Sequence, residues 1–368
     1  MTFSLNTTRR GAIALIAAAA ASMGIAQTAA AEVTFEGKTI EWIIPFSAGG
    51  GSDTWARFNA PFLSKYLPGN PTVVVVNEPG GGSTKGANLF AARAKPDGLT
   101  ILGTSGSTQF PYLLGDPRVR FDYQDWKIVM ASPTGGVAYT SPSTGVTSAA
   151  EIGKLKGQKL VYASQGATSL DLVPLLGFKL MGLDVQHVFG FKGRGDGRLA
   201  FERGETNIDY QTSSAYIKNV EPLVGEGKAV PLFSWGVLDD QGNLMRDPTF
   251  PDVPSYAEAY KSVTGQEPSG PDYDAYFAFF TAGFAAQKMV FLPKDTPQEI
   301  VDAYQAAVEE MKKDPEYQAT KESVLGTYEQ VTGAAANALF EKGTKITPEL
   351  REKVVTMLAT DYGVKLSE

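Results

Sequence analysis

The sequence of 368 residues predicts an α/β protein of two lobes, in which each lobe is a mostly parallel sheet flanked by helices. Three observations predict this fold. Strand-like segments alternate with helical segments, an order typical of parallel sheets. The strand–loop–helix layout of the first half is repeated after residue 150. Segments rich in proline, glycine or serine, near 133–142 and 231–236, are suited to cross between two lobes.

The first 31 residues have the pattern of an export signal. Arg9 and Arg10 form a charged start, an alanine-rich apolar run follows, and Ala29 and Ala31 fit a cleavage site before Glu32. A membrane anchor is the weaker alternative because the run is short. The arginine pair leaves both the general secretory route and the twin-arginine route open. The chain has no cysteine for a lipid anchor or a disulfide, so we expect a soluble protein outside the cytoplasm.

The rest of the chain divides by its pattern of elements. We expect residues 32–136 to form the first part of lobe 1 and residues 137–232 to form lobe 2. Residues 233–368 are expected to return to lobe 1 and to end in helices. The irregular stretch 239–271 has no functional interpretation.

The segment IEWIIPFSAGGGSDTWARFNAPFL, residues 40–63, contains the strongest local signal. A buried strand runs into a glycine loop, and the loop opens a helix that Ser52 or Asp53 is expected to cap. Such a loop points unpaired backbone N–H groups, at the positive end of a helix dipole, towards a carboxylate or phosphate. We expect valine at Gly50 to block the approach of the ligand to these N–H groups, and also to exclude the positive φ that we expect the loop to need there. The alternative is a plain strand-to-helix turn. One face of the helix is apolar, with Trp55, Phe58 and Phe62.

The later elements follow in order. PTVVVVNEP is a buried strand, an alanine-rich helix follows from about Gly86 to Ala94, and LTILGTSG is a third strand that ends in a polar loop. In lobe 2, KLVYAS is a strand, DLVPLLGFKLMG a helix, and VQHVFGF and NIDYQ further strands. YDAYFAFFTAGFAAQ is expected to be an aromatic strand or strand pair. TPQEIVDAYQAAV is a helix with Thr296 as its cap and Pro297 at its first position.

Composition excludes several kinds of function. The net charge of -7, with both signs interspersed, argues against nucleic acid as a partner. With one histidine, His187, and no cysteine, the chain is a poor candidate for a transition-metal site or a Ser-His-Asp triad. GGGSTKG lacks the spacing of a phosphate-binding loop, and the dinucleotide fingerprint is absent, so we expect no cofactor. Carboxylates are plentiful but do not form a spaced pair.

Several motifs together resemble one family. IIPFSAGGGSDTWAR, VVNEPGGGSTKGANLFAARAKPDGLTILGTSG, HVFGFKG, FPDVPSYAEA and FLPKDTPQEIVDAYQAAVEEMKKDPEY occur in the order found in receptors of tripartite tricarboxylate transporters, also called Bug receptors. The resemblance covers nearly the whole mature chain. It implies a two-lobed periplasmic binding-protein fold, type II-like, whose lobes close on a carboxylate. It also implies delivery of that ligand to a two-component membrane permease, with no catalysis.

The resemblance also implies a set of ligand-binding positions, most of them in polar loops. In lobe 1 these are Phe46, Ser47, Ala48, Gly49, Gly50, Asp53, Thr104, Ser105 and Gly106. In lobe 2 they are Gly166, Ala167, Thr168 and Ser169. Three further candidates are Lys192, Arg194 and Gln211, of which Arg194 and Gln211 stand where this chain departs from the usual family pattern. Lys192 and Arg194 could pair with the ligand or be solvated loop residues, and solvation is the favoured interpretation for each.

Two functions remain open from sequence. The favoured one is a monomeric periplasmic solute-binding protein for a small organic carboxylate. The alternative is a secreted two-lobed hydrolase or lyase acting on such an acid. Export, two similar lobes with polar loops and the shortage of catalytic side chains favour the binding protein. The ligand is left open among citrate-like acids, C4 dicarboxylates, acidic amino acids and aromatic carboxylates.

Overall fold

The computed structural model describes residues 1–2, 33–239, 241 and 243–366. Apart from Met1 and Thr2, the predicted export signal lies outside the described residues. Residues Thr34–Glu368 form one compact unit. Within the described part of the chain, no helix is both long enough and apolar enough to cross a membrane.

The first lobe is built on a five-stranded sheet with the order β2-β1-β3-β12-β4. β1 pairs in parallel with β2 and β3, whereas β12 runs antiparallel to both β3 and β4. β12 therefore lies inside the sheet although it comes much later in the chain. The strands are β1 (Thr39–Ile44), β2 (Thr72–Asn77), β3 (Thr100–Thr104), β4 (Lys127–Ser132) and β12 (Lys288–Leu292).

The second lobe repeats this plan with one difference in pairing. β5 lies between β8 and β9 and is antiparallel to both, so β8 and β9 run in the same direction. β6 and β7 form a parallel pair beside them, where the backbone N–H of Asn207 donates to the carbonyl of Val161 over 3.1 Å. In each lobe one strand that arrives from the other lobe is antiparallel to its neighbours. The first sheet is therefore mixed, whereas β8-β5-β9 is antiparallel throughout and β6-β7 is a separate parallel pair. The strands are β5 (Gly136–Thr140), β6 (Leu160–Ser164), β7 (Val185–Phe189), β8 (Ile208–Thr212) and β9 (Val230–Ser234).

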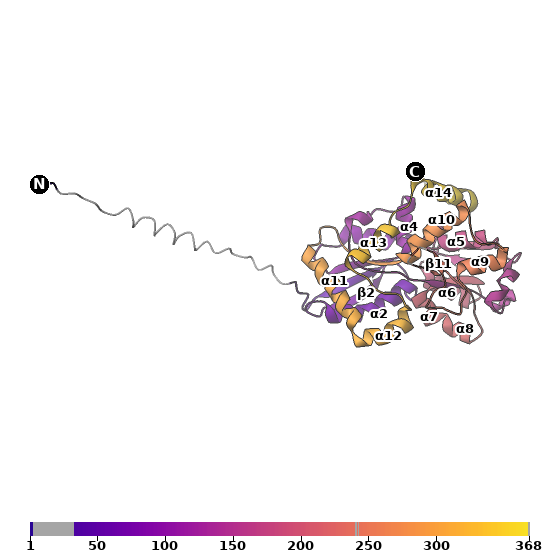
Figure 1. Cartoon of the computed structure of the whole chain (residues 1–368), viewed down its shortest axis with the longest axis horizontal. Coiled ribbons are helices and arrows are strands. Elements are labelled where there is room, and N and C mark those ends of the chain that lie inside the picture. The colour runs from indigo at the N-terminus through magenta and orange to yellow at the C-terminus, as the bar shows by residue number, and fades with distance from the viewer. Residues whose placement is uncertain (3–32, 240, 242, 367–368) are drawn as a thin grey trace. The chain divides into compact units, whose positions relative to one another are not determined.

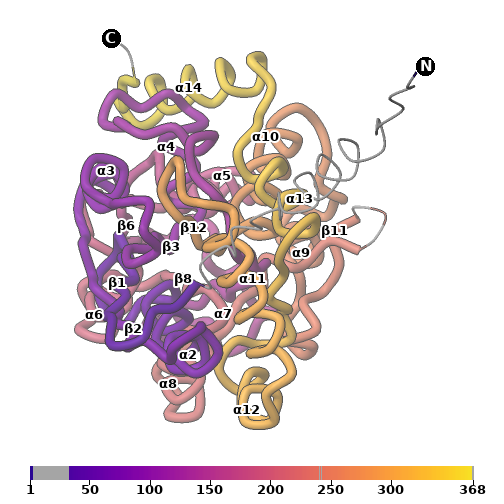
Figure 2. The backbone as a smooth tube through the Cα atoms, turned by 90° about the vertical axis from the view of Figure 1, so that its left-hand side faces the viewer, coloured from indigo at the N-terminus to yellow at the C-terminus, as the bar shows by residue number. Residues whose placement is uncertain are grey.

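Helices cover both sheets (Figure 1). The first lobe has α2 (Gly51–Tyr66), α3 (Thr84–Arg93), α4 (Gly106–Leu114), α11 (Gln298–Lys313), α12 (Pro315–Leu325) and α13 (Gly333–Gly343). The second has α5 (Leu172–Leu180), α6 (Arg194–Glu202), α7 (Ser213–Asn219), α8 (Glu221–Gly225) and α9 (Tyr256–Thr264). Two more, α10 (Pro271–Phe280) and α14 (Pro348–Tyr362), pack together, and α14 also lies against α4 (Figure 2). The short strands β10 (Val237–Leu238) and β11 (Leu244–Met245) pair with each other. The α/β prediction with two lobes is confirmed.

The segment YDAYFAFFTAGFAAQ, residues 273–287, is not the predicted aromatic strand or strand pair. It forms most of α10 and a π-helical turn, Thr281–Ala285. Pro271 occupies the first turn with Asp272 and Asp274, residues that favour a helix N-terminus. Aromatic side chains recur at helical spacing and fill the second lobe's core together with side chains of α4, α5 and α14. Tertiary packing of that face outweighs the strand propensity of aromatic residues.

Two predicted helix caps are also wrong. α2 begins at Gly51 with Gly50 as its N-cap, and no side chain caps it. α11 begins at Gln298 with Pro297 as its N-cap, and the Thr296 hydroxyl donates instead to the carbonyl of Pro293. The predicted apolar face of α2 is confirmed for Trp55, the first of its three aromatic residues. Trp55 packs edge-on against Trp42 of β1, with 5.3 Å between the ring centroids.

Candidate functional site

A polar cavity lies at the carboxyl ends of β1 and β3, where ligands bind in open α/β sheets. Because β12 is antiparallel, its first residue, Lys288, reaches the same edge. The second lobe closes the cavity with residues that follow β6, with Thr212 at the end of β8 and with the start of α6. The lining residues are Phe46, Gly50, Gly51, Ser52, Ser105, Ser107, Gln165, Leu170, Arg194, Thr212, Gln287 and Lys288.

The two lobes touch around this cavity. The Ser214 hydroxyl donates to the carbonyl of Gly51 over 3.0 Å, and a Cβ placed on Gly195 would lie 2.7 Å from the carbonyl of Ala48. About 20 Å³ of the cavity is open to the centre of a water molecule, which is room for roughly one water. A carboxylate of several heavy atoms is larger than this volume.

Two helices begin at the cavity. The first residues of α2 line it, and because α2 has no side-chain cap, its N-terminal N–H groups are left to other partners. At α4 the Ser105 hydroxyl accepts a hydrogen bond from the N–H of Ser107 over 3.2 Å, within a capping box. Both helix dipoles place partial positive charge beside the cavity, which favours an anion.

Asp53 is turned towards its own loop. Its carboxylate accepts hydrogen bonds from the N–H of Gly49 at 2.9 Å, from Arg57 at 2.8 Å and from Asn77 at 3.0 Å. These bonds hold the glycine loop in place. The loop takes a positive φ at Gly49 (78°), whereas Gly50 has a φ of −83°. The expectation that Gly50 needs a positive φ is therefore wrong, and a side chain there would meet backbone of the second lobe instead.

Lys288 is the charged residue among the cavity residues that sequence reasoning missed. The others are Gly51, Ser52, Ser107, Gln165, Leu170, Thr212 and Gln287. Its side chain is 2 % exposed, and its ammonium donates to the Ser52 hydroxyl over 2.8 Å. None of the acidic residues that the structure describes forms an ion pair with it. Burial without a counter-ion lowers the pKa of Lys288 to about 7. The available signal was the polar pair Gln287 and Lys288 directly before the apolar run MVFLP.

Two glutamines add unmet polar groups to the same cavity. The Oε1 atom of Gln287 is buried and has no hydrogen-bond partner. The Nε2 atom of Gln165 is likewise unpaired, while its Oε1 accepts from the Ser107 hydroxyl over 3.3 Å. Buried polar groups are normally hydrogen-bonded, so these atoms mark places where a ligand or water would bind.

Arg194 is not a solvated loop residue. It is 6 % exposed and forms ion pairs with Asp171 and Asp209, while its guanidinium lies 4.8 Å and 4.7 Å from the ring centroids of Tyr162 and Tyr210. The two carboxylates, far apart in sequence, neutralise its charge. Arg194 therefore organises the second lobe's side of the cavity and leaves Lys288 as the unneutralised cation among the described cavity residues.

The predicted binding residues are divided between several places. Phe46, Gly50, Ser105 and Arg194 line the cavity. Gly166, Ala167 and Thr168 line another pocket, beside residues 116–118 and 364–366, where the Thr168 hydroxyl donates to Asp116 over 3.1 Å.

The remaining predicted residues lie near the cavity without lining it. The Ser47 hydroxyl is buried without a partner, and Ala48 and Gly49 continue the same loop. Thr104 is buried at the end of β3, and Gly106 approaches Leu170 so closely that a Cβ would lie 2.7 Å away. Ser169 donates to the carbonyl of Gly166, Gln211 donates to the carbonyl of Arg194 over 2.9 Å, and Lys192 is exposed.

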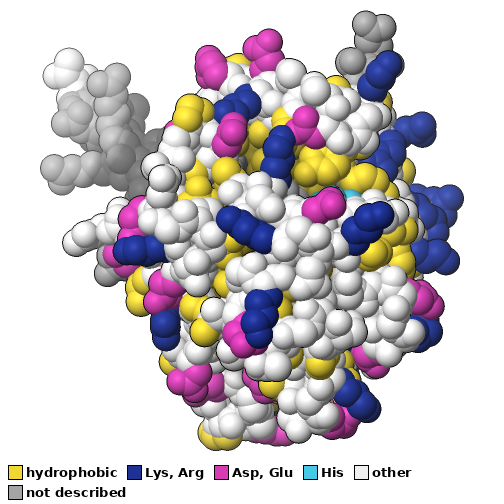
Figure 3. Space-filling model, turned by 90° about the vertical axis from the view of Figure 1, so that its right-hand side faces the viewer, with side chains coloured by type: hydrophobic (Ala, Val, Ile, Leu, Met, Phe, Trp, Pro, Cys, Tyr) yellow, Lys and Arg dark blue, Asp and Glu magenta, His cyan; other side chains and the backbone are white. Residues whose placement is uncertain are grey.

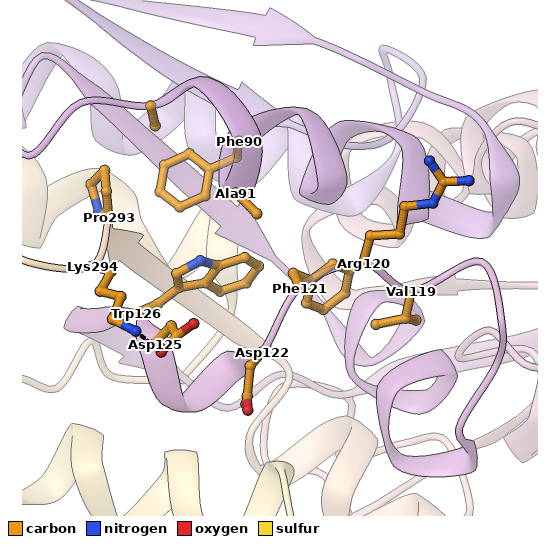
Figure 4. Close-up of a pocket in the computed structure, with 11 residues that line it drawn as sticks. Phe90, Ala91, Val119, Arg120, Phe121, Asp122, Asp125, Trp126, Pro293 and Lys294 are labelled. Atoms are coloured by element: carbon orange, nitrogen blue, oxygen red, sulfur yellow. Dashed lines mark hydrogen bonds and ion pairs between the residues drawn. The ribbon is translucent and has the colours of Figure 1, made fainter.

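A further pocket lies at the opposite end of β12 from Lys288 (Figure 4). Phe90, Phe121 and Trp126 lie together there, and Lys294 is paired with Asp125 over 2.8 Å. Because this lysine already has a counter-ion, the pocket lacks the unpaired charge of the cavity between the lobes.

The described residues give little support for metal binding or for catalysis by histidine. No group of three potential metal ligands occurs in the described part of the chain. His187 packs against Tyr162 and Tyr362, and burial lowers its pKa to about 4. Acidic and basic side chains both occur across the surface in Figure 3.

A polar cavity between two α/β lobes, with helix N-termini and one unpaired cation, defines the class of two-lobed solute-binding proteins.

Comparison with known proteins identifies the family. Residues 56–329 match the family model "Tripartite tricarboxylate transporter family receptor", and the chain belongs to that family. A UPF0065 protein of Bordetella pertussis is 30% identical over 250 residues, 67% of this chain and 72% of that protein.

Two solved structures share the fold. A periplasmic transporter has a TM-score of 0.67 and 22% identity, with 91% of this chain and 100% of that one covered. MatC from Rhodopseudomonas palustris with bound malate has a TM-score of 0.63 and 21% identity, with 86% and 98% covered.

Proposed function

We propose that this protein captures a small organic carboxylate between its lobes and delivers it to a two-component membrane permease. The observation that carries the proposal is the cavity at the start of α2, where Lys288 is a buried cation without an acidic partner. Membership in a transporter receptor family supports delivery to a permease. MatC, which shares the fold, holds malate, itself a dicarboxylate. We take the protein to act as a monomer.

The lobes are proposed to hinge near 133–142 and 231–236. Lobe 1 then holds residues 32–136 and most of 233–368, and lobe 2 holds 137–232 together with α9, which packs against β9. The sheets support this division, because β4 and β5 belong to different sheets and are joined through a proline and a glycine. The segment 239–245, described only in part, follows the second crossing.

The enzyme alternative is a secreted hydrolase or lyase. Membership in a receptor family does not support it. A receptor returns its ligand unchanged, so mass spectrometry of an acid recovered after incubation with the protein separates the two functions.

We expect the mature protein to begin near Glu32 and to be free in the periplasm, as members of its family are periplasmic receptors. The sequence supports this through the charged start, the apolar run and the small residues before Glu32. N-terminal sequencing of the exported protein checks it. Retention of Met1 on a membrane-held protein would contradict it.

A thermal-shift screen over small carboxylates tests the binding function. A ligand that binds only the native state stabilises it by about 2.7 kcal/mol at 100 times its dissociation constant, so the melting temperature rises. We expect at least one di- or tricarboxylate to raise it, and neutral amides of the same acids to leave it unchanged. If no carboxylate raised the melting temperature, the proposed function would be wrong.

A further inference from the structure

The first lobe carries a preformed pair of polar groups at the cavity. Gln287 and Lys288 are adjacent in sequence, and both line the cavity. Gln287 directly precedes β12, which begins at Lys288. Both belong to the first lobe's return segment. Their arrangement therefore does not depend on how far the second lobe has closed.

Lys288 and Gln287 need different partners, an anion for the ammonium group and a hydrogen-bond donor for the amide oxygen. The Lys288 ammonium donates to Ser52 but has no anion beside it, and a buried charge is costly without a counter-charge. The Gln287 Oε1 atom accepts no hydrogen bond and needs a donor. Arg194, the other cation at the cavity, is already neutralised by Asp171 and Asp209.

We propose that Lys288 pairs with a carboxylate of the ligand and that Gln287 accepts a hydrogen bond from a hydroxyl group of the same ligand, which makes the ligand a small hydroxycarboxylate. This inference rests on the proposed function and assigns its ligand class. An unsubstituted dicarboxylate dianion has no donor for Gln287. An amino acid has a donor, but its ammonium group would bring a second positive charge close to Lys288.

The burial of Lys288 explains how a bound anion would favour closure of the two lobes. When the lobes close, the Lys288 ammonium loses water on all sides, and the lowered pKa of Lys288 records the cost of that burial. A carboxylate beside it removes much of this cost. The anion therefore favours the closed arrangement more than the open one, which is the requirement for a ligand that shifts a conformational equilibrium.

The test uses pairs of acids that differ only by a hydroxyl group, namely malate with succinate and citrate with tricarballylate. Calorimetric titration of the wild-type protein is expected to show at least about tenfold tighter binding of the hydroxy acid in one pair, as loss of a buried hydrogen bond would predict. Equal affinity within a pair that binds, or tighter binding of the acid without the hydroxyl, overturns the ligand class. Binding of only the unsubstituted acids would also overturn the ligand class, but the proposed function of carboxylate binding would still hold.

Two variants separate the roles of the residues. Gln287→Leu is expected to remove the preference for the hydroxy acid and leave the affinity for its partner unchanged. Lys288→Met is expected to weaken both acids by about 100-fold or more, because a charge-assisted contact is lost. Lys294→Met, at the other end of β12, is the matched control and should bind as the wild type does.

Lys288→Met is also expected to raise the melting temperature. If Lys288 served only to stabilise the fold, the substitution would lower it. The folded pKa of about 7 lies below the ordinary value of 10.5, so the unfolded state binds more protons between these pH values. The variant should melt above the wild type at pH 7, and the difference should shrink as the pH rises towards 10.5. A variant that melts below the wild type, or binds both acids within about threefold of it, overturns the role of Lys288.

Discussion

A Gly51→Val variant is expected to lose ligand affinity by at least about 100-fold while both lobes stay folded. A Cβ at Gly51 would lie 1.8 Å from the Thr212 hydroxyl oxygen and 3.2 Å from the Thr212 Cβ, across the contact between the lobes. Gly51 is the first residue of α2 and has no positive φ, so the first lobe can accept a side chain there. The variant therefore holds the lobes apart and leaves each of them intact.

Calorimetric titration with a ligand from the thermal-shift screen measures the lost affinity, and small-angle scattering measures the lost closure. Scattering of the wild-type protein should change when the ligand is added, and scattering of Gly51→Val should not. Gly153→Val is the matched control, because a Cβ at Gly153 meets nothing within 4 Å. Wild-type affinity in Gly51→Val would show that binding does not need this contact between the lobes.

An Arg194→Leu variant is expected to lower the free energy of unfolding by about 3–5 kcal/mol, the usual effect of removing one partner from a buried ion pair. Asp171 and Asp209 are fully buried and would be left without their cation. The guanidinium also donates to the carbonyl of Ala163 over 2.5 Å and to that of Tyr210 over 3.2 Å. Those carbonyls would lose a donor as well.

Urea denaturation at pH 7 measures this change. The control is Arg203→Leu, because Arg203 pairs with Glu205 at the surface, where ion pairs contribute little. A midpoint for Arg194→Leu equal to that of the control would show that the two carboxylates are not held by Arg194.

The part of the site that local sequence reveals is the glycine loop with its helix. The apolar strand, the glycines and the aromatic face of α2 all lie within residues 40–63, so the pattern alone predicted the turn at the sheet edge. Local sequence could not show that the Asp53 carboxylate would accept hydrogen bonds that brace the loop. Its partner Asn77 comes from the end of the next strand, and that contact depends on sheet pairing.

Lys288 and Arg194 show why the rest could not be predicted. The direction of β12 decides which end of the strand reaches the cavity, and a pattern of apolar residues has no direction. The strand interpretation of 273–287 also hid the polar pair Gln287 and Lys288, which follows the π-helical turn. Arg194 stands among glycines, which suggests an exposed loop, and its burial depends on carboxylates that only the folded second lobe brings together.

The place of β12 in the first sheet has a consequence for the order in which the chain can fold. β4 has β12 as its strand neighbour, and β3 has β12 on the side away from β1. Until residues 288–292 have been synthesised, the first lobe has a gap in its sheet, with unpaired backbone groups on both sides of it. These pairings are remote in sequence, and such topologies fold slowly. A nascent chain of this protein thus stays incompletely folded for most of its synthesis, a state compatible with passage through a membrane before folding.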